Sequence, residues 1–238
     1  MAPPAGPGYT IRSEGSVRAR EPTLEGYAVP RKPPARSYAP EETRRLLVEA
    51  ALDLFAEKGF SRASMQEVVQ RAGVTKGAFY HHFATKDDVL HLIHDEFIDR
   101  ALESQERALA GHASPTEQLA RMAFDTTLIC ITYQKHVRVF FRELHVLTGD
   151  VRAAILEKRR RATALFEDTV RRGVESGEFD QDLDPTVAAL GLLGMWVWSY
   201  QWYDAEGRRT PTEIAEQFAV MSLQSVGAKR LPSAVRSR

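Results

Sequence analysis

The sequence predicts an all-α protein, with a three-helix helix-turn-helix unit near the amino terminus and a larger helical domain after it. Apolar side chains recur at helical spacing from Leu46 onward. Gly and Pro residues stand between these apolar stretches, at positions where helices end and begin. No stretch shows the convincing alternation of apolar and polar residues that marks a half-buried strand.

The composition excludes several classes of protein. The 238 residues, of which 43% are hydrophobic and 27% charged, are typical of a globular chain. No run approaches the roughly 20 apolar residues of a membrane-spanning helix, and residues 1–30 contain no apolar segment of a secretory signal. The single cysteine, Cys130, excludes a disulfide framework and a Cys-based zinc site, and its apolar neighbours favour an inert buried thiol. We therefore expect a cytoplasmic protein without a membrane partner.

Residues 1–40 differ in composition from the rest of the chain. They hold eight of the twelve prolines and few aliphatic side chains, so they cannot bury enough apolar surface to offset the entropy of ordering. We predict a disordered tail over residues 1–40 and a short carboxy-terminal tail over residues 229–238.

The amino-terminal helices have clear start and end signals. The first helix follows Pro40, a residue that suits the first turn, and ends at Gly59. Ser64 and Glu67 form a capping box that opens a short second helix, and Gly73 closes this helix.

The remaining helices follow from the same signals. Thr75 can cap a third short helix, and Thr85 with Asp88 can cap a fourth that runs to about Leu109. Further helices are predicted for residues 115–134, 135–147, 150–176, 185–205 and 211–227. We divide this part of the chain into a helix-turn-helix domain, residues 41–88, and a larger domain, residues 89–228.

The net charge of zero hides an uneven distribution. Residues 31–86 carry ten Lys and Arg against six Asp and Glu, whereas residues 87–238 carry nineteen against twenty-three. A basic amino-terminal module is thus joined to a mildly acidic domain, and a basic module suits a polyanionic partner. Because the asymmetry is small, its meaning depends on the residues that the module contains.

The second and third helices are joined at Gly73 and Val74, as in a helix-turn-helix motif. Three side chains of the third helix share one face, which is expected to pack in the core: Phe79, His82 and Phe83. The opposite face holds Lys76, Gly77, Tyr80 and His81. Free N–H groups at a helix start beside a lysine suit phosphate binding. The alternative is a small helical core whose polar residues are exposed by chance.

Three stretches of this module resemble the DNA-binding domain of the TetR (tetracycline-repressor-like) regulators. They are residues 50–60, 64–69 and 73–83, followed by Lys86, and the likeness is dense over about residues 43–90. The resemblance implies a transcriptional regulator, normally a repressor, that binds a palindromic operator as a homodimer. It also implies that a small-molecule effector releases the DNA, with the helix over residues 86–109 as the lever.

The family pattern assigns roles to individual residues. It places at base edges Gln66, Lys76 and Gly77. It places at phosphates Ser64, Thr75, Tyr80, His81 and Lys86. It makes His82 a core residue. Including residues that flank these positions, the predicted DNA-binding set is Arg44, Ser64, Gln66, Thr75, Lys76, Gly77, Ala78, Tyr80, His81 and Lys86.

Residues 185–205 form the most apolar segment of the chain and include all three tryptophans. A helix that is apolar all round is buried on every side, by the core, by a partner subunit or by a ligand. The family resemblance implies that part of this helix and the helix over residues 211–227 pair with their copies in a dimer interface. One or two of the aromatic side chains are expected to face a ligand.

Residues 158–161, with the sequence Lys-Arg-Arg-Arg, have two interpretations. A charged run is usually a solvated helix face. Because a helix spreads four consecutive residues around its circumference, however, one arginine is expected to point inward. An inward arginine requires an anion, which Glu143, Asp150, Glu157 or an acidic ligand could supply.

The larger domain resembles, more loosely, a TetR subgroup that responds to acyl-CoA thioesters of fatty-acid, steroid or aromatic-acid breakdown. The likeness lies in residues 139–144, 158–160 and 183–203. It implies an apolar cavity for the acyl group and basic residues for the CoA phosphates. The predicted ligand-binding residues are Phe140, Phe141, Arg159, Arg160, Trp198 and Trp202. The alternative effectors are a free hydrophobic acid or a cationic drug, the latter in a repressor of drug efflux genes.

A helical enzyme that binds no DNA is the remaining alternative. The sequence contains no G-x-S-x-G, Walker, G-x-G-x-x-G or H-E-x-x-H motif. The pairs His81-His82 and His91-x-x-His94 lack a convincing third ligand for a metal ion. We therefore expect no catalytic residue, no metal and no cofactor.

Overall fold

A computed structural model of the protein describes residues 39–229, so all but residues 39 and 40 of the predicted tail 1–40, and all but residue 229 of the predicted tail 229–238, lie outside the described residues. The prediction of an all-α protein is confirmed for the described part, which contains nine helices and no strand. They are α1 (Pro40–Lys58), α2 (Met65–Ala72), α3 (Lys76–His82), α4 (Lys86–Gly111), α5 (Pro115–Thr132), α6 (Gln134–Glu143), α7 (Gly149–Glu175), α8 (Pro185–Trp202) and α9 (Pro211–Ser225). None of these helices combines the length and apolarity needed to span a membrane.

Local sequence signals determine most helix ends. Ser64 and Thr85 are the N-caps of α2 and α4, each within a capping box as predicted. Gly73 ends α2 in the left-handed region, with φ of 69°, which favours glycine. The helix predicted for residues 135–147 ends earlier, at Glu143, because a turn closed by the Val146 N–H and the Glu143 carbonyl (2.9 Å) replaces its last turn.

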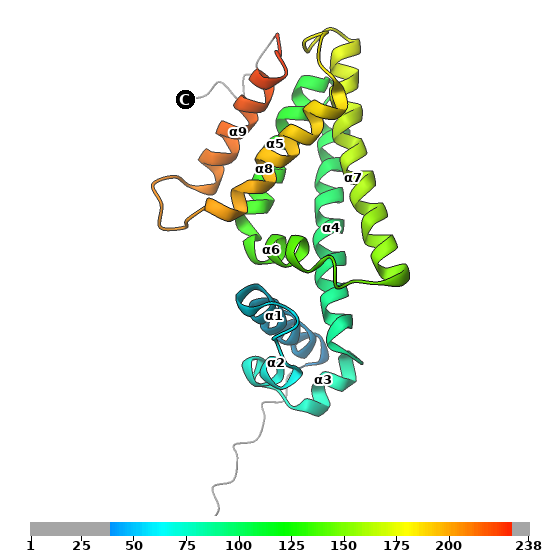
Figure 1. The fold of residues 1–238 in the computed structure, drawn as a ribbon. Helices are drawn as coiled ribbons and strands as arrows, with labels where there is room; N and C mark the ends of the chain where they lie inside the picture. The colour runs from blue at the N-terminus through cyan, green and yellow to red at the C-terminus, as the bar shows by residue number, and fades with distance from the viewer. Residues whose placement is uncertain (1–38, 230–238) are drawn as a thin grey trace, which may run out of the picture. The chain divides into compact units, whose positions relative to one another are not determined.

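The long helix α4 takes part in both halves of the described chain (Figure 1). Its first turns share an apolar cluster with α1–α3 and α6, which contains Phe55, Phe79 and Phe140. A second cluster lies among α5, α7, α8 and α9, around Phe166 and the fully buried Trp196. The domain boundary predicted between residues 88 and 89 falls inside α4, within the first of these clusters.

Among residues 39–229, only one side of α8 is covered by other helices. Trp196 is fully buried on that side. On the other side Val187 is 67% exposed, Leu190 52%, Trp198 61% and Trp202 48%. The single chain therefore leaves uncovered one face of the helix that the sequence predicts to be buried all round.

Candidate functional site

The exposed face of the α2–α3 pair gathers most of the predicted DNA-binding residues. Phe79, 1% exposed, and Phe83 anchor α3 from below, which directs its other face to solvent. Seven predicted residues are exposed: Ser64, Gln66, Thr75, Lys76, Gly77, Tyr80 and His81. Ala78 is half-buried, and so is His82, for which the family pattern implies a core position. The face thus presents one cation, one phenol, one imidazole and two hydroxyls around a small glycine.

Two of the predicted phosphate-contacting hydroxyls also hold helix starts in place. Ser64 Oγ accepts from the Glu67 N–H at 3.3 Å and donates to the Glu67 carboxylate at 2.7 Å. Hydrogen bonds from Lys58 and then from Ser64 lower the pKa of Glu67 to about 2. Thr75 Oγ1 accepts from the Ala78 N–H at 3.1 Å, and within residues 39–229 no acceptor takes its proton, which is available to a ligand.

Lys86 is tied to the protein on one side. Its Nζ donates to the carbonyls of Phe60 (2.8 Å) and Ala63 (2.9 Å), and it lies 4.1 Å from the centroid of the Phe60 ring. Both carbonyls belong to the loop between α1 and α2, so Lys86 holds this loop against the start of α4. One of its three N–H groups is left for a phosphate. Arg44, half-buried on α1, lies 3.9 Å from Glu96.

A buried carboxylate joins α6 to the end of α1. Glu143, 5% exposed, accepts from the Phe60 N–H at 3.2 Å and from Arg142 Nε at 2.9 Å. Arg142 also donates to the Phe55 carbonyl. The Phe60 N–H, just beyond the end of α1, thus has the Glu143 carboxylate as its acceptor, whereas the Phe55 carbonyl accepts from both Arg142 and the Gly59 N–H (3.0 Å). The sequence pattern indicates Glu143 only as a candidate partner for an inward arginine, and no local signal reveals its contact with α1.

Two cations of the basic run connect α7 to α4. Lys158 Nζ lies 2.5 Å from Asp95 and 2.7 Å from Asp99, and both carboxylates belong to α4. Arg161 pairs with Glu106, on the same helix. This half of the run is therefore a solvent-accessible ion-pair seam between two helices.

The other two cations of the run lie in different surroundings. Arg160 pairs with Glu157, one turn away on α7. Arg159 makes no ion pair within residues 39–229, and its guanidinium carbon lies 5.5 Å from the centroid of the Phe141 ring. Arg159 is the arginine that points toward the interior helices, and none of the carboxylates suggested as its partner reaches it.

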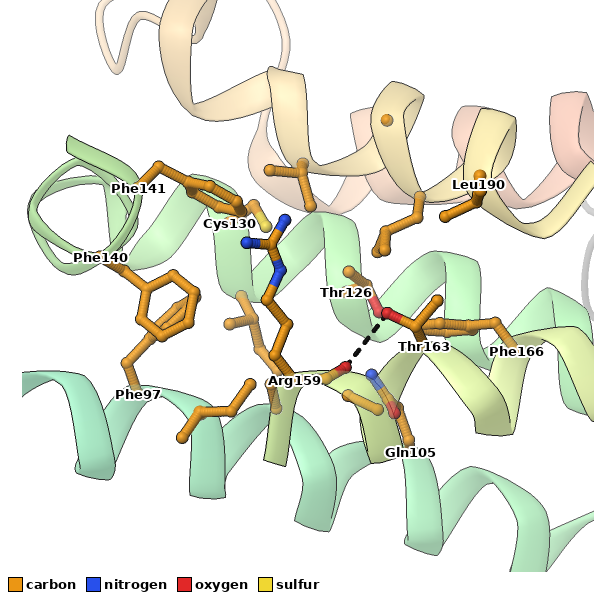
Figure 2. A pocket seen from close by; sticks show the side chains of 17 residues that line it. Phe97, Gln105, Thr126, Cys130, Phe140, Phe141, Arg159, Thr163, Phe166 and Leu190 are labelled. Atoms are coloured by element: carbon orange, nitrogen blue, oxygen red, sulfur yellow. Dashed lines mark hydrogen bonds between the residues drawn. The ribbon is translucent and has the colours of Figure 1, made fainter. Parts of the chain in front are cut away.

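A pocket of about 260 Å³ lies beside Arg159, between α4, α5, α6, α7 and α8 (Figure 2). Its wall is predominantly apolar and includes Phe97, Ile98, Ile129, Phe140, Phe141, Phe166 and Leu193. Arg159 and Leu190 are exposed and mark the mouth. Three of the predicted ligand-binding residues, Phe140, Phe141 and Arg159, thus line one pocket.

Few polar groups interrupt the apolar wall. They are Gln105 on α4, Thr126 on α5 and Thr163 on α7, in addition to Arg159. Thr163 Oγ1 donates to the Arg159 carbonyl at 3.1 Å (Figure 2). The Cys130 thiol also lines the pocket and is buried, as predicted, and burial raises its pKa to about 12.

A shallow groove on the outside of α7 continues from the mouth of the pocket. The groove has a volume of about 410 Å³, shares Arg159 and Thr163 with the pocket and adds Arg160. The two tryptophans of the predicted ligand set lie elsewhere. Trp198 belongs to the exposed face of α8, and Trp202 lines a separate hollow near the turn between α8 and α9. The structure therefore brings four of the six predicted ligand residues together.

The described histidine and acidic side chains do not form a metal site. In the part of the chain that the structure describes, no three His, Cys, Asp or Glu side chains are grouped to hold a metal ion. His94 is fully buried, and its Nδ1 is hydrogen-bonded with the Leu90 carbonyl at 2.9 Å. Burial lowers the pKa of His94, which favours a neutral imidazole.

Two family models match the chain. The model described as bacterial regulatory proteins, tetR family, matches residues 47–93, which contain the α2–α3 pair. The model described as tetracyclin repressor-like, C-terminal domain, matches residues 112–226, which contain α5–α9.

Individual proteins match over most of the described chain. The transcriptional repressor KstR2 of Mycobacterium tuberculosis is 25% identical over 182 residues, or 76% of this chain and 90% of that protein. A TetR/AcrR-family regulator of Thermobifida fusca is 32% identical in a match that covers 78% of this chain and 97% of that chain, with a TM-score of 0.61. AibR, solved in complex with isovaleryl coenzyme A and operator DNA, is 29% identical over 76% of this chain and 97% of that chain, with a TM-score of 0.67.

Proposed function

Because the chain belongs to the TetR family of bacterial transcriptional regulators, we propose that it is a dimeric repressor that an acyl-CoA thioester releases from its operator. The DNA-reading surface is the exposed face of α2 and α3, and the effector site is the pocket beside Arg159. The relatives support this pairing of functions, since KstR2 is a transcriptional repressor and AibR was solved with an acyl-CoA and DNA.

At the DNA surface, Lys76 and Gln66 supply the base contacts. Both are exposed, and Lys76 makes no ion pair within residues 39–229 that would compete with a guanine O6 or N7. Gly77 and the half-buried Ala78 are small enough to let the α3 backbone approach the groove. The residues proposed for phosphate contacts are Arg44, Ser64, Thr75, Tyr80, His81 and Lys86.

At the effector site, the observation that carries the proposal is Arg159, at the mouth of an apolar pocket, which has no carboxylate partner among the described residues. A volume of about 260 Å³ lies below the roughly 300–1,000 Å³ of most ligand sites, so the pocket suits an acyl group and not the whole CoA. The groove outside the pocket is lined by Arg159 and Arg160 together with one carboxylate, Glu167, and the two arginines are the groups proposed to bind the CoA phosphates.

A free hydrophobic acid is the second candidate effector. Arg159 alone can bind a carboxylate in bidentate fashion without help from the groove. A cationic drug fits less well, because no Asp or Glu is among the described residues that line the pocket.

The exposed face of α8 supports dimerisation. Val187, Leu190, Trp198 and Trp202 lie at helical spacing on that face, and Gly194 between them has open space beside it, which permits close approach of a second helix. We therefore assign α8 and α9 to a two-fold interface that positions two recognition helices on a palindrome.

The proposal is tested by selecting duplexes from random DNA with the purified protein and then titrating the selected operator with acyl-CoAs of graded length and branching. At least one thioester is expected to lower operator affinity by about 5–150-fold, the range typical of coupled sites. Arg159→Met, which keeps an apolar stem, is expected to weaken the thioester and its effect on DNA. Arg171→Met, another cation of α7 that does not line the pocket, is the control.

Lys76→Ala is expected to relax sequence preference while leaving the protein dimeric. The proposal fails if no duplex is enriched, or if neither thioesters nor the matching free acids change operator affinity. Release by free acids alone would replace the thioester with the second candidate.

A further inference from the structure

One polar side chain in the effector pocket has no partner. Gln105, on α4, is 4% exposed and lines the pocket, yet its Oε1 has no hydrogen-bond partner and its amide joins no hydrogen bond within residues 39–229. Figure 2 shows the side chain rising from α4 with its amide nitrogen turned toward the cavity. Native structures rarely leave a buried amide without a partner, because burial removes its bonds to water.

The surroundings of Gln105 form a polar band across an otherwise apolar wall. Thr126 on α5 and Thr163 on α7 line the same pocket. The Thr163 hydroxyl already donates its hydrogen bond to the Arg159 carbonyl. The amide nitrogen of Gln105 can donate to a ketone or a hydroxyl oxygen, whereas Oε1, the buried atom without a partner, can accept only from a hydroxyl group. A purely alkyl ligand would bury this amide further and give it nothing to bind.

We propose that the effector carries a ketone or hydroxyl oxygen on the part that enters the pocket, and that Gln105 selects this oxygen. The inference rests on the proposed effector site and specifies its ligand: a partly oxidised acyl group, with the CoA end of the thioester toward Arg159. Gln105 lies on α4, the helix whose start shares an apolar cluster with α1–α3, so the selected oxygen binds directly to the helix that reaches the DNA-reading unit.

Calorimetric titration of the full-length protein tests the inference with pairs of thioesters that differ by one oxygen. Suitable probes are straight-chain acyl-CoAs against their 3-oxo and terminally hydroxylated forms, and cyclohexanecarboxyl-CoA against its 4-oxo form. These probes carry the oxygen at different positions, and only a suitably placed oxygen can reach Gln105. At least one oxygenated thioester is therefore expected to bind about tenfold or more tightly than its parent.

Two variants assign the preference to Gln105. Gln105→Leu and Gln105→Met remove an amide without a partner and keep an apolar side chain of similar size, so both are expected to fold. In both, the preference for oxygen is expected to disappear while affinity for the parent thioester is kept or rises. Thr127→Val is the matched control, because Thr127 Oγ1 is also buried without a partner but does not line the pocket. This control is expected to keep the preference.

The outcomes separate this inference from the proposed function. Equal binding of parent and oxygenated thioesters to the wild-type protein would overturn the role of Gln105 and leave the acyl-CoA effector standing. Persistence of the preference in both Gln105 variants would do the same. Failure of every thioester to bind, oxygenated or not, would overturn the proposed effector class itself.

Discussion

The contact between α6 and α1 yields a quantitative prediction for Glu143→Ala. The substitution leaves the Phe60 N–H without its acceptor at 3.2 Å, in a region where Glu143 itself is 5% exposed. An unsatisfied buried N–H costs about 1–3 kcal/mol. The Arg142 side chain is 41% exposed, so loss of the ion pair adds only about 0–1 kcal/mol. Together these contributions span about 1–4 kcal/mol, and we expect the free energy of unfolding to fall by an amount near the middle of this range, about 2–3 kcal/mol.

Thermal unfolding followed by circular dichroism measures this effect. For a chain of this size, a loss of about 2–3 kcal/mol corresponds to a melting temperature lower by about 4–12 °C. Glu143→Gln keeps an acceptor for the Phe60 N–H and should lose about 1 kcal/mol or less. Glu157→Ala removes the exposed partner of Arg160 and should be nearly neutral. The reasoning is refuted if Glu143→Ala melts at the temperature of the Glu157→Ala control.

Three further substitutions follow from the same contacts. Lys86→Ala is expected to lower the melting temperature as well as the affinity for every duplex, since Nζ donates to two loop carbonyls; an unchanged melting temperature would contradict the loop contact. Glu67→Gln is expected to reduce the pH dependence of stability. The pKa of Glu67 is lowered to about 2, so its contribution is present above its ordinary pKa and is lost as the pH falls toward 2. This is tested by measuring the denaturant midpoints of the wild type and of Glu67→Gln at neutral pH and near pH 3. An equal fall of the midpoint in the two proteins between these pH values would argue against the prediction. Gly173→Ala places a Cβ 2.1 Å from the Phe179 ring and should cost about 1–3 kcal/mol, whereas Gly111→Ala, with open space beside it, is the control that should unfold like the wild type.

The uncovered face of α8 and the mouth of the pocket are close neighbours in the structure. Leu190 and Gly194 belong to both, because they line the pocket and lie on the exposed side of the helix. A second subunit on this face would therefore border the effector as well as set the spacing of the two recognition helices. Effector binding and dimer geometry would then be linked through one helix, which gives the effector a direct way to favour one spacing of the recognition helices.

Local sequence signals were sufficient for most of the helix ends and for the face that α3 exposes. Capping boxes at Ser64 and Thr85 and a left-handed glycine at Gly73 depend on residues within a few positions of one another, so they can be read from the chain alone. Helical spacing likewise placed Phe79 inside and Tyr80 outside on α3.

Contacts between distant residues were not accessible in this way. Periodicity assigns a residue to a face of its helix but does not say what covers that face. It could not show that Trp196 is buried while Trp198 is 61% exposed, or that Arg159 lacks the carboxylate that its neighbour Arg160 has. It gave no sign that Lys86 binds a loop.

The sequence by itself determined the helices, their order and the residues that α3 turns toward solvent, because these depend on propensity, capping and spacing along one segment. The tertiary structure decided which polar groups meet a partner. Glu143 finds the Phe60 N–H across 83 positions of sequence, whereas Gln105 finds no partner and is left facing the pocket. Pairing between distant segments depends on how the helices pack together, and no pattern within a single helix encodes it.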